Sequence, residues 1–322
     1  MKGLILHQII NFLKSAVARG PGGGINSCYI VRDGSIYCRN MTLTAGVAME
    51  SEVPFSVPAE ELDAALKRMK EIQSLTVNED NIVVKSGRLK STIKTYDGEP
   101  PPIPEMPEEW TPFPPGLIPA LNLAKGFIGD RPGTDGIRLM QGRVTSQSGQ
   151  AGIDITVEGL ELEKQILLPI DAAEFLIAQG EALEYAIDKT AAYFRWEDGR
   201  WLKTQLLIVE FPHDSVEKIY SMAGDNDPVT INEEWREACE DVEALCDEVF
   251  LITDGGFRGF KGAATHDVEF ETGLPEKHIS SWSMKYMHLI FPHAESWHPL
   301  SYPQPALFTG PGFRGVVMGF RR

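Results

Sequence analysis

Three short stretches decide the fold, and the first reads Phe55-Ser56-Val57-Pro58-Ala59-Glu60-Glu61-Leu62. An apolar run ends at a proline, and a helical pattern follows over Ala64–Met69. Because proline is tolerated in the first turn of a helix, this stretch predicts a strand that leads directly into a helix. The same order returns at Ile166–Asp171, where Pro169 stands 111 residues after Pro58, and again at Ile279–Ser283.

A glycine turn and a second helix recur at nearly the same spacing. Turns at Gly87, Gly199 and Gly312 each precede an apolar strand pattern, and helical patterns start near residues 4, 117 and 231, the last with Thr230 as its expected N-cap. The chain therefore consists of three units, each with the order helix, strands, helix, strands. Short connections and hairpin signals predict α+β domains in which two helices per unit pack on antiparallel sheets.

Loop-rich stretches give the expected domain boundaries. The proline-rich stretch 98–115 is not expected to form regular structure, and we interpret it as a linker, although a proline-rich segment can also be an SH3-type ligand. The polar stretch 221–228 is the expected second junction. The predicted domains are residues 1–111, 112–222 and 223–322.

The charge limits the kinds of partner. The formal net charge is −16, from 30 basic and 46 acidic residues. Such a chain is poorly suited to grip DNA by neutralising phosphates wholesale, but a ring that encloses DNA needs only a basic hole. No apolar run reaches the roughly 18 residues of a membrane span. We therefore expect an intracellular, cytoplasmic protein with no membrane partner.

Motifs for catalysis and metal binding are missing from the sequence. There is no Gly-x-Ser-x-Gly elbow and no Gly-Lys-Ser/Thr loop, and the run Gly20–Gly24 follows a helix rather than a strand. The cysteines at 28, 38, 239 and 246 form no CxxC pair. Five histidines lie at 266, 278, 288, 293 and 298, and scattered histidines are the better interpretation than a metal site. We predict no enzyme, no metal and no cofactor.

The order of motifs resembles a known family. The quoted residues are the run Gly34–Leu43 followed by Phe55–Leu62, the turn Ser86-Gly87-Arg88, the stretch Phe211-Pro212-His213-Asp214, and the tail Val316-Val317-Met318-Gly319-Phe320-Arg321-Arg322. Together they resemble the bacterial DNA polymerase III beta subunit, the DNA sliding clamp, over nearly the whole chain. The resemblance implies a homodimer ring of three-domain subunits joined head to tail.

The resemblance also implies partners and a peptide site. The expected partners are duplex DNA, encircled without sequence preference, a DNA polymerase, a clamp loader and a second copy of the chain. An apolar peptide groove is expected between the second and third domains. Its implied residues are Val157, Gly159, Leu160, Leu162, Pro212, Val216, Val316, Met318, Gly319, Phe320 and Arg321. Leu160-Glu161 and Gly319-Phe320 depart from the family pattern, which implies a different peptide preference and a divergent or phage-encoded member.

Helix faces and nearby loops are expected to contact DNA. The implied DNA-facing residues are Lys14, Arg19, Lys67, Arg68, Lys70, Lys125, Arg131 and Lys285. Cations also favour helix C-termini because of the helix dipole, so the dipole alone can explain any one of these residues without DNA. The helix at 231–246 contradicts a basic hole, because six acids stand there against Arg236. Either that helix turns its acids away from the hole, or the ring binds DNA weakly there.

The ring interface should pair the strand near residues 89–96 with the third domain, with Ile93 and Leu245 as candidates. The main alternative function is a phage structural or host-interaction protein built from repeated α+β units without DNA binding.

Overall fold

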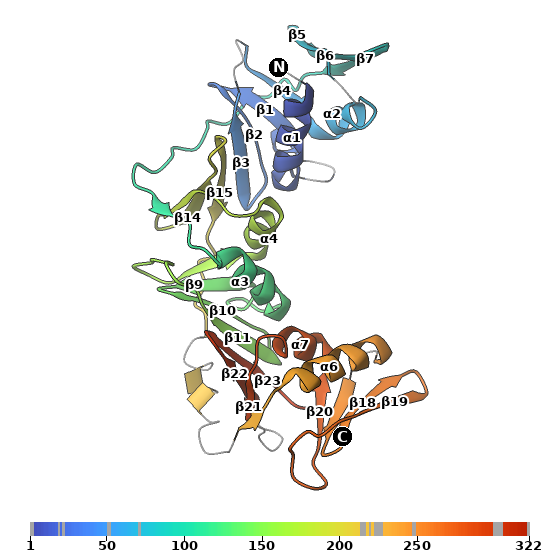
Figure 1. Cartoon of the computed structure of the whole chain (residues 1–322). Helices are drawn as coiled ribbons and strands as arrows, with labels where there is room; N and C mark the ends of the chain where they lie inside the picture. The colour runs from blue at the N-terminus through green and yellow to red at the C-terminus, as the bar shows by residue number, and fades with distance from the viewer. Residues whose placement is uncertain are drawn as a thin grey trace. The chain divides into compact units, whose positions relative to one another are not determined.

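The computed structural model describes residues 3–18, 20, 23–49, 53–69, 72–212, 217–218, 220–221, 228–246, 249–298 and 305–320. It has an α+β fold in which helices pack on antiparallel sheets, as the sequence predicted (Figure 1). None of the described helices combines the length and the apolar character that crossing a bilayer requires. The chain divides into two compact units, residues 1–113 with 174–206 and residues 114–173 with 207–322. The boundaries of the three predicted domains stay a prediction.

The first unit holds an eight-stranded and a three-stranded sheet, with orders β4-β1-β2-β3-β15-β14-β13-β8 and β5-β6-β7. Its elements are α1 (Gly3–Leu13), η1 (Lys14–Ala16), η2 (Gly24–Ser27), β1 (Cys28–Arg32), β2 (Ser35–Arg39), β3 (Leu43–Ala48), β4 (Phe55–Pro58), α2 (Ala59–Leu66), β5 (Ser74–Val77), β6 (Asn81–Ser86), β7 (Leu89–Lys94), β8 (Thr111–Pro112), β13 (Glu184–Ile187), β14 (Ala191–Arg195) and β15 (Arg200–Gln205). Through the pair β3–β15, the eight-stranded sheet joins β1–β4 of the first sequence repeat to β13–β15 of the second. Its last strand, β8, pairs with β13, so the prediction that stretch 98–115 lacks regular structure is wrong at Thr111–Pro112.

The joint between β3 and β15 requires a glycine. Gly46 lies opposite Trp201, and a Cβ at Gly46 would stand 2.1 Å from the indole ring, far inside van der Waals contact. Beneath this sheet, Phe12 of α1 packs edge-on against Phe175 and Trp196, with ring centroids 5.1 Å and 5.4 Å away. Such aromatic contacts add about 0.5–1.5 kcal/mol each beyond the burial of apolar area.

The second unit holds an eight-stranded sheet of order β12-β9-β10-β11-β23-β22-β21-β16 and a four-stranded sheet of order β19-β18-β17-β20. Its elements are α3 (Leu117–Ala124), η3 (Lys125–Phe127), β9 (Gly136–Met140), β10 (Arg143–Gln147), β11 (Ala151–Thr156), β12 (Ile166–Pro169), β16 (Val229–Thr230), α6 (Glu233–Leu245), β17 (Val249–Thr253), β18 (Gly256–Lys261), β19 (Ala264–Glu269), β20 (Ile279–Ser283), α7 (Met284–Ile290), β21 (Ser296–His298), β22 (Ala306–Gly310) and β23 (Phe313–Val317). Helix α4 (Ile170–Gln179) begins in this unit and ends in the first.

The eight-stranded sheet of the second unit has two different faces. Helices α3 and α7 cover one face (Figure 1), and a Cβ at Gly315 of β23 would meet Ile290 of α7 at 3.2 Å. Because successive side chains of a strand alternate between faces, Arg314 and Val316 of β23 lie on the other face, opposite Asp154 and Gly152 of β11. The candidate site lies on this second face.

The predicted repeats are confirmed in their order, with shifts at element ends. Each strand-to-helix switch is present, at β4–α2, β12–α4 and β20–α7. The turn glycines Gly87, Gly199 and Gly312 have φ values of 57°, 82° and 63°, a region that suits glycine. The predicted N-cap Thr230 is wrong: it ends β16, and the Asn232 side chain instead accepts from the Trp235 amide at 3.1 Å and caps α6.

Candidate functional site

A small pocket lies beside the C-terminal strand in the second unit. The turn between β10 and β11, residues 147–152, forms one wall, and Pro305, Val316 and Met318 form the other. Its volume is about 70 Å³. We call it the tail pocket. The pairs Ala151–Val317 and Gly152–Val316 and a hydrogen bond from the Met318 amide to the Gln150 carbonyl (2.7 Å) hold the two walls together.

Ser148 fixes the shape of the turn that forms the first wall. Its hydroxyl accepts from the amides of Gln150 (3.2 Å) and Ala151 (3.1 Å), and its own amide donates to the Ala151 carbonyl (2.7 Å). The hydroxyl also contacts Tyr286 Oη at 3.0 Å. A serine hydroxyl that bonds nearby backbone in this way stabilises a tight turn, so Ser148 holds the backbone of this wall in place.

Gly152 leaves the space that the pocket occupies. A Cβ at Gly152 would meet Gln147 Cβ at 3.2 Å, the Ser146 carbonyl oxygen at 3.3 Å and Val316 Cγ2 at 3.6 Å. Any side chain at this position would therefore project between the turn and Val316. The pocket can accept one apolar anchor side chain, and burying such a side chain is worth about 1.5–3 kcal/mol.

An apolar cluster supports the pocket from below. Val316 is buried against Leu167, Phe211, Tyr220 and Leu307. Val316 thus belongs both to this cluster and to the wall of the pocket, so the position of the wall depends on the packing beneath it.

A buried ion network ties the same strands together. Asp154 of β11 is 4% exposed and forms ion pairs with Arg143 of β10 and with Arg314 of β23, the latter at 2.5 Å. Arg314 also pairs with Glu217 at 3.0 Å, and its guanidinium lies 4.2 Å from the centroid of the Tyr220 ring. Burial, with Asp154 nearby, raises the pKa of Tyr220 above its usual value, so the phenol stays neutral.

The structure does not bring the predicted wall at 157–162 to this pocket. The Val157 amide donates to the Gly142 carbonyl and the Gly142 amide to the Leu160 carbonyl, so this turn covers the opposite end of the β10–β11 hairpin. At about 3.4 Å per residue the strands separate the two ends by roughly 20 Å. Val157 and Leu160 are buried, Gly159 lies near Pro114, and the Leu162 amide donates to Gln141 Oε1. Beside Val316 and Met318 the structure therefore has residues 147–152 rather than 157–162, and the assignment of a peptide groove stays a prediction.

The other predicted groove residues divide into three groups. Val316 and Met318 line the tail pocket. Gly319 and Phe320 continue along β20, where the Phe320 amide donates to the Ser281 carbonyl at 2.9 Å, and Pro212 follows the cluster residue Phe211. Val216 and Arg321 lie outside the described residues. The wall at 147–152 was missed because no family motif marks it, although its polar Gln147–Gln150 run between two strand patterns signals a hairpin turn.

The predicted DNA-facing cations are placed in part. Lys67, Arg68, Lys125, Arg131 and Lys285 are exposed, and Lys14 is half-buried in η1. Arg19 and Lys70 lie outside the described residues. Each described cation stands on a helix or at most a few residues beyond a helix end, and their role toward DNA stays a prediction.

Helix α6 presents its acids to solvent. Trp235, Ala238, Cys239 and Val242 are buried, whereas Glu233, Glu234, Glu237, Glu240, Asp241 and Glu243 are exposed. The apolar side of the helix packs against β18 and β19, so the acids occupy the side away from the sheet.

Of the two predicted ring-interface candidates, Ile93 is buried in β7, and Leu245 is 38% exposed at the end of α6.

The described histidines do not gather into a metal centre. Within the described residues, no group of three or more His, Cys, Asp or Glu side chains is arranged to hold a metal ion. His278 contacts Ser280 Oγ at 2.9 Å and packs edge-on against Trp297, and His288 bonds the Met284 carbonyl at 2.7 Å.

Comparison with solved structures identifies the fold. Comparison with family models and with curated proteins finds no match. The structure is similar over 100% of the chain to the DNA polymerase sliding clamp of Pseudomonas aeruginosa (TM-score 0.79, 15% identity, 99% of that chain). It is similarly close to the Caulobacter crescentus beta sliding clamp, with a TM-score of 0.81, 15% identity and coverage of 98% of that chain. For the Helicobacter pylori beta clamp bound to a DNA ligase peptide, the TM-score is 0.78, the identity 13% and the coverage 99% of that chain. The chain therefore has the fold of bacterial DNA polymerase III beta sliding clamps.

Proposed function

We propose that this protein is a non-catalytic DNA sliding clamp: two copies close into a ring around duplex DNA, and the tail pocket tethers a polymerase and a clamp loader. The observation that carries the proposal is the strand order. Two eight-stranded sheets each join strands of successive repeats, whereas the β5–β6–β7 and β17–β20 strands form two shorter sheets that end at β7 and at β19.

The internal repeat predicts how these two sheet ends are used. In the two long sheets the joints are the antiparallel pairs β3–β15 and β11–β23. By position in the repeat, β19 is the counterpart of β3 and β11, and β7 is the counterpart of β15 and β23. The missing third joint is therefore β19 of one copy with β7 of another, and two such joints close a dimer head to tail.

The known register can be transferred to this joint. Phe313 of β23 and Leu89 of β7 are each the first paired residue after the glycine turn of their hairpin. Ile155 of β11 and Val268 of β19 are also equivalent, because each pairs with the second residue of the preceding strand. Since Phe313 pairs with Ile155, Leu89 should pair with Val268 and Lys90 with Asp267. Lys90–Asp267 would then reproduce the ion pair that Arg314 and Asp154 make across β23 and β11.

Charge supports the same pairing. Lys90 and Lys94 make β7 basic, and Arg88 precedes it, whereas Asp267 and Glu269 make β19 acidic. Opposite charges directly across an antiparallel pair contribute about 0.2–1 kcal/mol each, and like charges destabilise it. Pairing β7 with β7 or β19 with β19 is disfavoured, so the charges select the head-to-tail arrangement.

A ring explains how an acidic chain holds DNA. The net charge of −16 and the exposed acids of α6 oppose a tight electrostatic grip. A closed ring holds the duplex topologically and lets it slide, which is what a polymerase needs from a processivity factor. The test is retention: the protein should stay on closed circular DNA and be lost when the circle is cut.

The tail pocket is the proposed attachment point for partners. The Helicobacter pylori structure holds a DNA ligase peptide, and the Caulobacter crescentus structure holds polyethylene glycol at a putative beta-motif tethering region. By analogy, we expect an apolar side chain of a polymerase or loader peptide to enter between Gly152 and Val316. The departures at Gly319-Phe320 lie beside the pocket and imply a peptide preference of this chain's own.

A further inference from the structure

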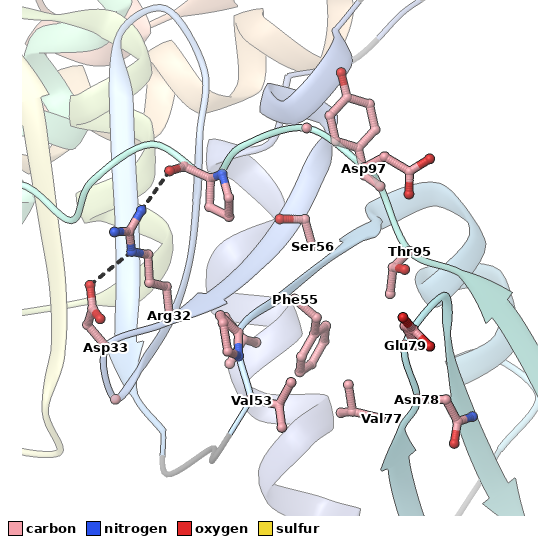
Figure 2. Close-up of a pocket in the computed structure, with 16 residues that line it drawn as sticks. Arg32, Asp33, Val53, Phe55, Ser56, Val77, Asn78, Glu79, Thr95 and Asp97 are labelled. Atoms are coloured by element: carbon pink, nitrogen blue, oxygen red, sulfur yellow. Dashed lines mark hydrogen bonds and ion pairs between the residues drawn. The ribbon is translucent and has the colours of Figure 1, made fainter.

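A large cleft in the first unit shares no lining residue with the tail pocket. It has a volume of about 920 Å³ and lies between the end of the eight-stranded sheet and the three-stranded sheet (Figure 2). Four segments line it: the β1–β2 turn (31–34), the start of β4 (53–56), the β5–β6 turn (77–79) and the chain that follows β7 (95–98 and 100). We call it the edge cleft. Its size is at the upper end of the roughly 300–1,000 Å³ of ligand pockets.

The lining combines an apolar floor with an acidic rim. Val53, Phe55 and Val77 lie together in the cleft (Figure 2), and Val53 is 49% exposed. Asp33, Glu79 and Asp97 are exposed around them. The rim therefore carries three carboxylates around a patch that can accept an apolar side chain.

The cation of the lining is already engaged. Arg32 donates from Nε to Asp33 at 3.1 Å and from Nη1 to the Pro100 carbonyl at 2.9 Å (Figure 2). Among the residues that the structure describes, the one ion pair of Asp97 is a long contact of 3.9 Å to Lys94, with both side chains about four-fifths exposed, and Glu79 makes none. The rim thus has negative charge left to attract a basic ligand.

A buried hydroxyl in the lining also lacks a partner. Ser56 is 2% exposed, and its Oγ has no hydrogen-bond partner within the described part of the chain. A buried polar atom without a partner costs about 1–3 kcal/mol. A ligand that supplies a hydrogen bond to Ser56 Oγ would remove that cost, which distinguishes this cleft from an acidic surface alone.

We propose that the edge cleft binds a short peptide segment of a partner protein in which apolar side chains are flanked by Lys or Arg. The apolar side chains pack on Val53, Phe55 and Val77, the basic side chains approach Glu79 and Asp97, and a peptide backbone group bonds Ser56 Oγ. The edge cleft belongs to the first unit, whereas the tail pocket belongs to the second.

The test is fluorescence anisotropy on the full chain with two labelled peptides, Gly-Lys-Leu-Leu-Lys-Gly and the same peptide with Glu in place of both Lys. The first should bind at least about tenfold more tightly, as expected for two opposite-charge contacts instead of two like-charge ones. The double variant Glu79→Lys/Asp97→Lys should remove this preference. Ser56→Ala should weaken binding about two- to tenfold, the range for one hydrogen bond, while the charge preference remains.

Two controls separate the site from general acidity and from the tail pocket. Glu108→Lys/Glu109→Lys makes the same charge change at exposed positions of the same unit outside the cleft and should bind like the original chain. Met318→Asp alters the tail pocket and should also leave binding unchanged. Equal binding of both peptides, a preference that survives Glu79→Lys/Asp97→Lys, or a loss caused by either control would overturn the proposal.

Discussion

Gly152 leaves open the space of the proposed peptide site. It lies between Gln147 and Val316 at the joint of β11 and β23. A leucine there should fill the tail pocket and reduce the affinity for polymerase peptides at least about tenfold, the value of 1.4 kcal/mol. Peptides that tile the replicative polymerase of the source cell, measured by anisotropy, provide the readout. Gly255→Leu is the matched control, because a Cβ there meets nothing within 4 Å; unchanged affinity in Gly152→Leu would contradict the assignment.

Asp154 should be the most sensitive charge of the second unit. Asp154→Asn leaves Arg143 and Arg314 without the buried carboxylate that both contact. Breaking such a buried network by removing one partner costs about 3–5 kcal/mol in the free energy of unfolding. Asp267→Asn, which removes one partner of the half-exposed pair with Arg258, should cost less than about 1 kcal/mol. Urea denaturation of both variants tests this, and equal losses would show that the network contributes little.

At the scale of elements, the sequence predicts what is local and misses what is distant. The switch at Pro58 and the turn at Gly87 depend on neighbouring residues, so the repeat could be read directly. The pairing of β3 with β15 brings together residues that are about 150 positions apart, and no local pattern encodes it. Residues 157–162 were predicted as a wall beside the C-terminal residues, and they lie far from Met318 for the same reason: which end of the β10–β11 hairpin meets Met318 follows from the register of β23.

The β7–β19 joint can be tested with a charge exchange. Lys90→Glu and Asp267→Lys should each weaken the dimer, because each places like charges across both joints of the ring. The double variant restores opposite charges and should recover most of the loss. Sedimentation equilibrium measures the dimer constant, with Lys203→Glu on β15, inside the first sheet, as a control for a charge change away from the joint. Single variants that dimerise normally, or a double variant that recovers nothing, would contradict the transferred register.

At the scale of the whole molecule, the acidic charge predicts a weak dependence on salt. A protein that holds DNA through phosphate contacts loses affinity with a log–log slope of about −0.9 per contact. If enclosure holds the protein on closed circles, the slope of log retention against log salt concentration should be shallower than about −2, as long as the salt keeps the dimer intact. The measurement is the fraction that co-elutes with circular DNA in gel filtration between low and moderate salt. A steep slope would mean that direct phosphate contacts hold the complex.

Enclosure itself is tested most directly by cutting the circle. The labelled protein is loaded on a nicked circular plasmid by the clamp loader of its source cell, the free protein is removed, and half of the sample is linearised with a restriction enzyme. We predict that the protein remains on the circle for many minutes and leaves the linear DNA within the dead time of gel filtration, and that blocking both ends with bound protein restores retention. Equal retention on circular and open-ended linear DNA, or no retention on either, would contradict the proposed ring.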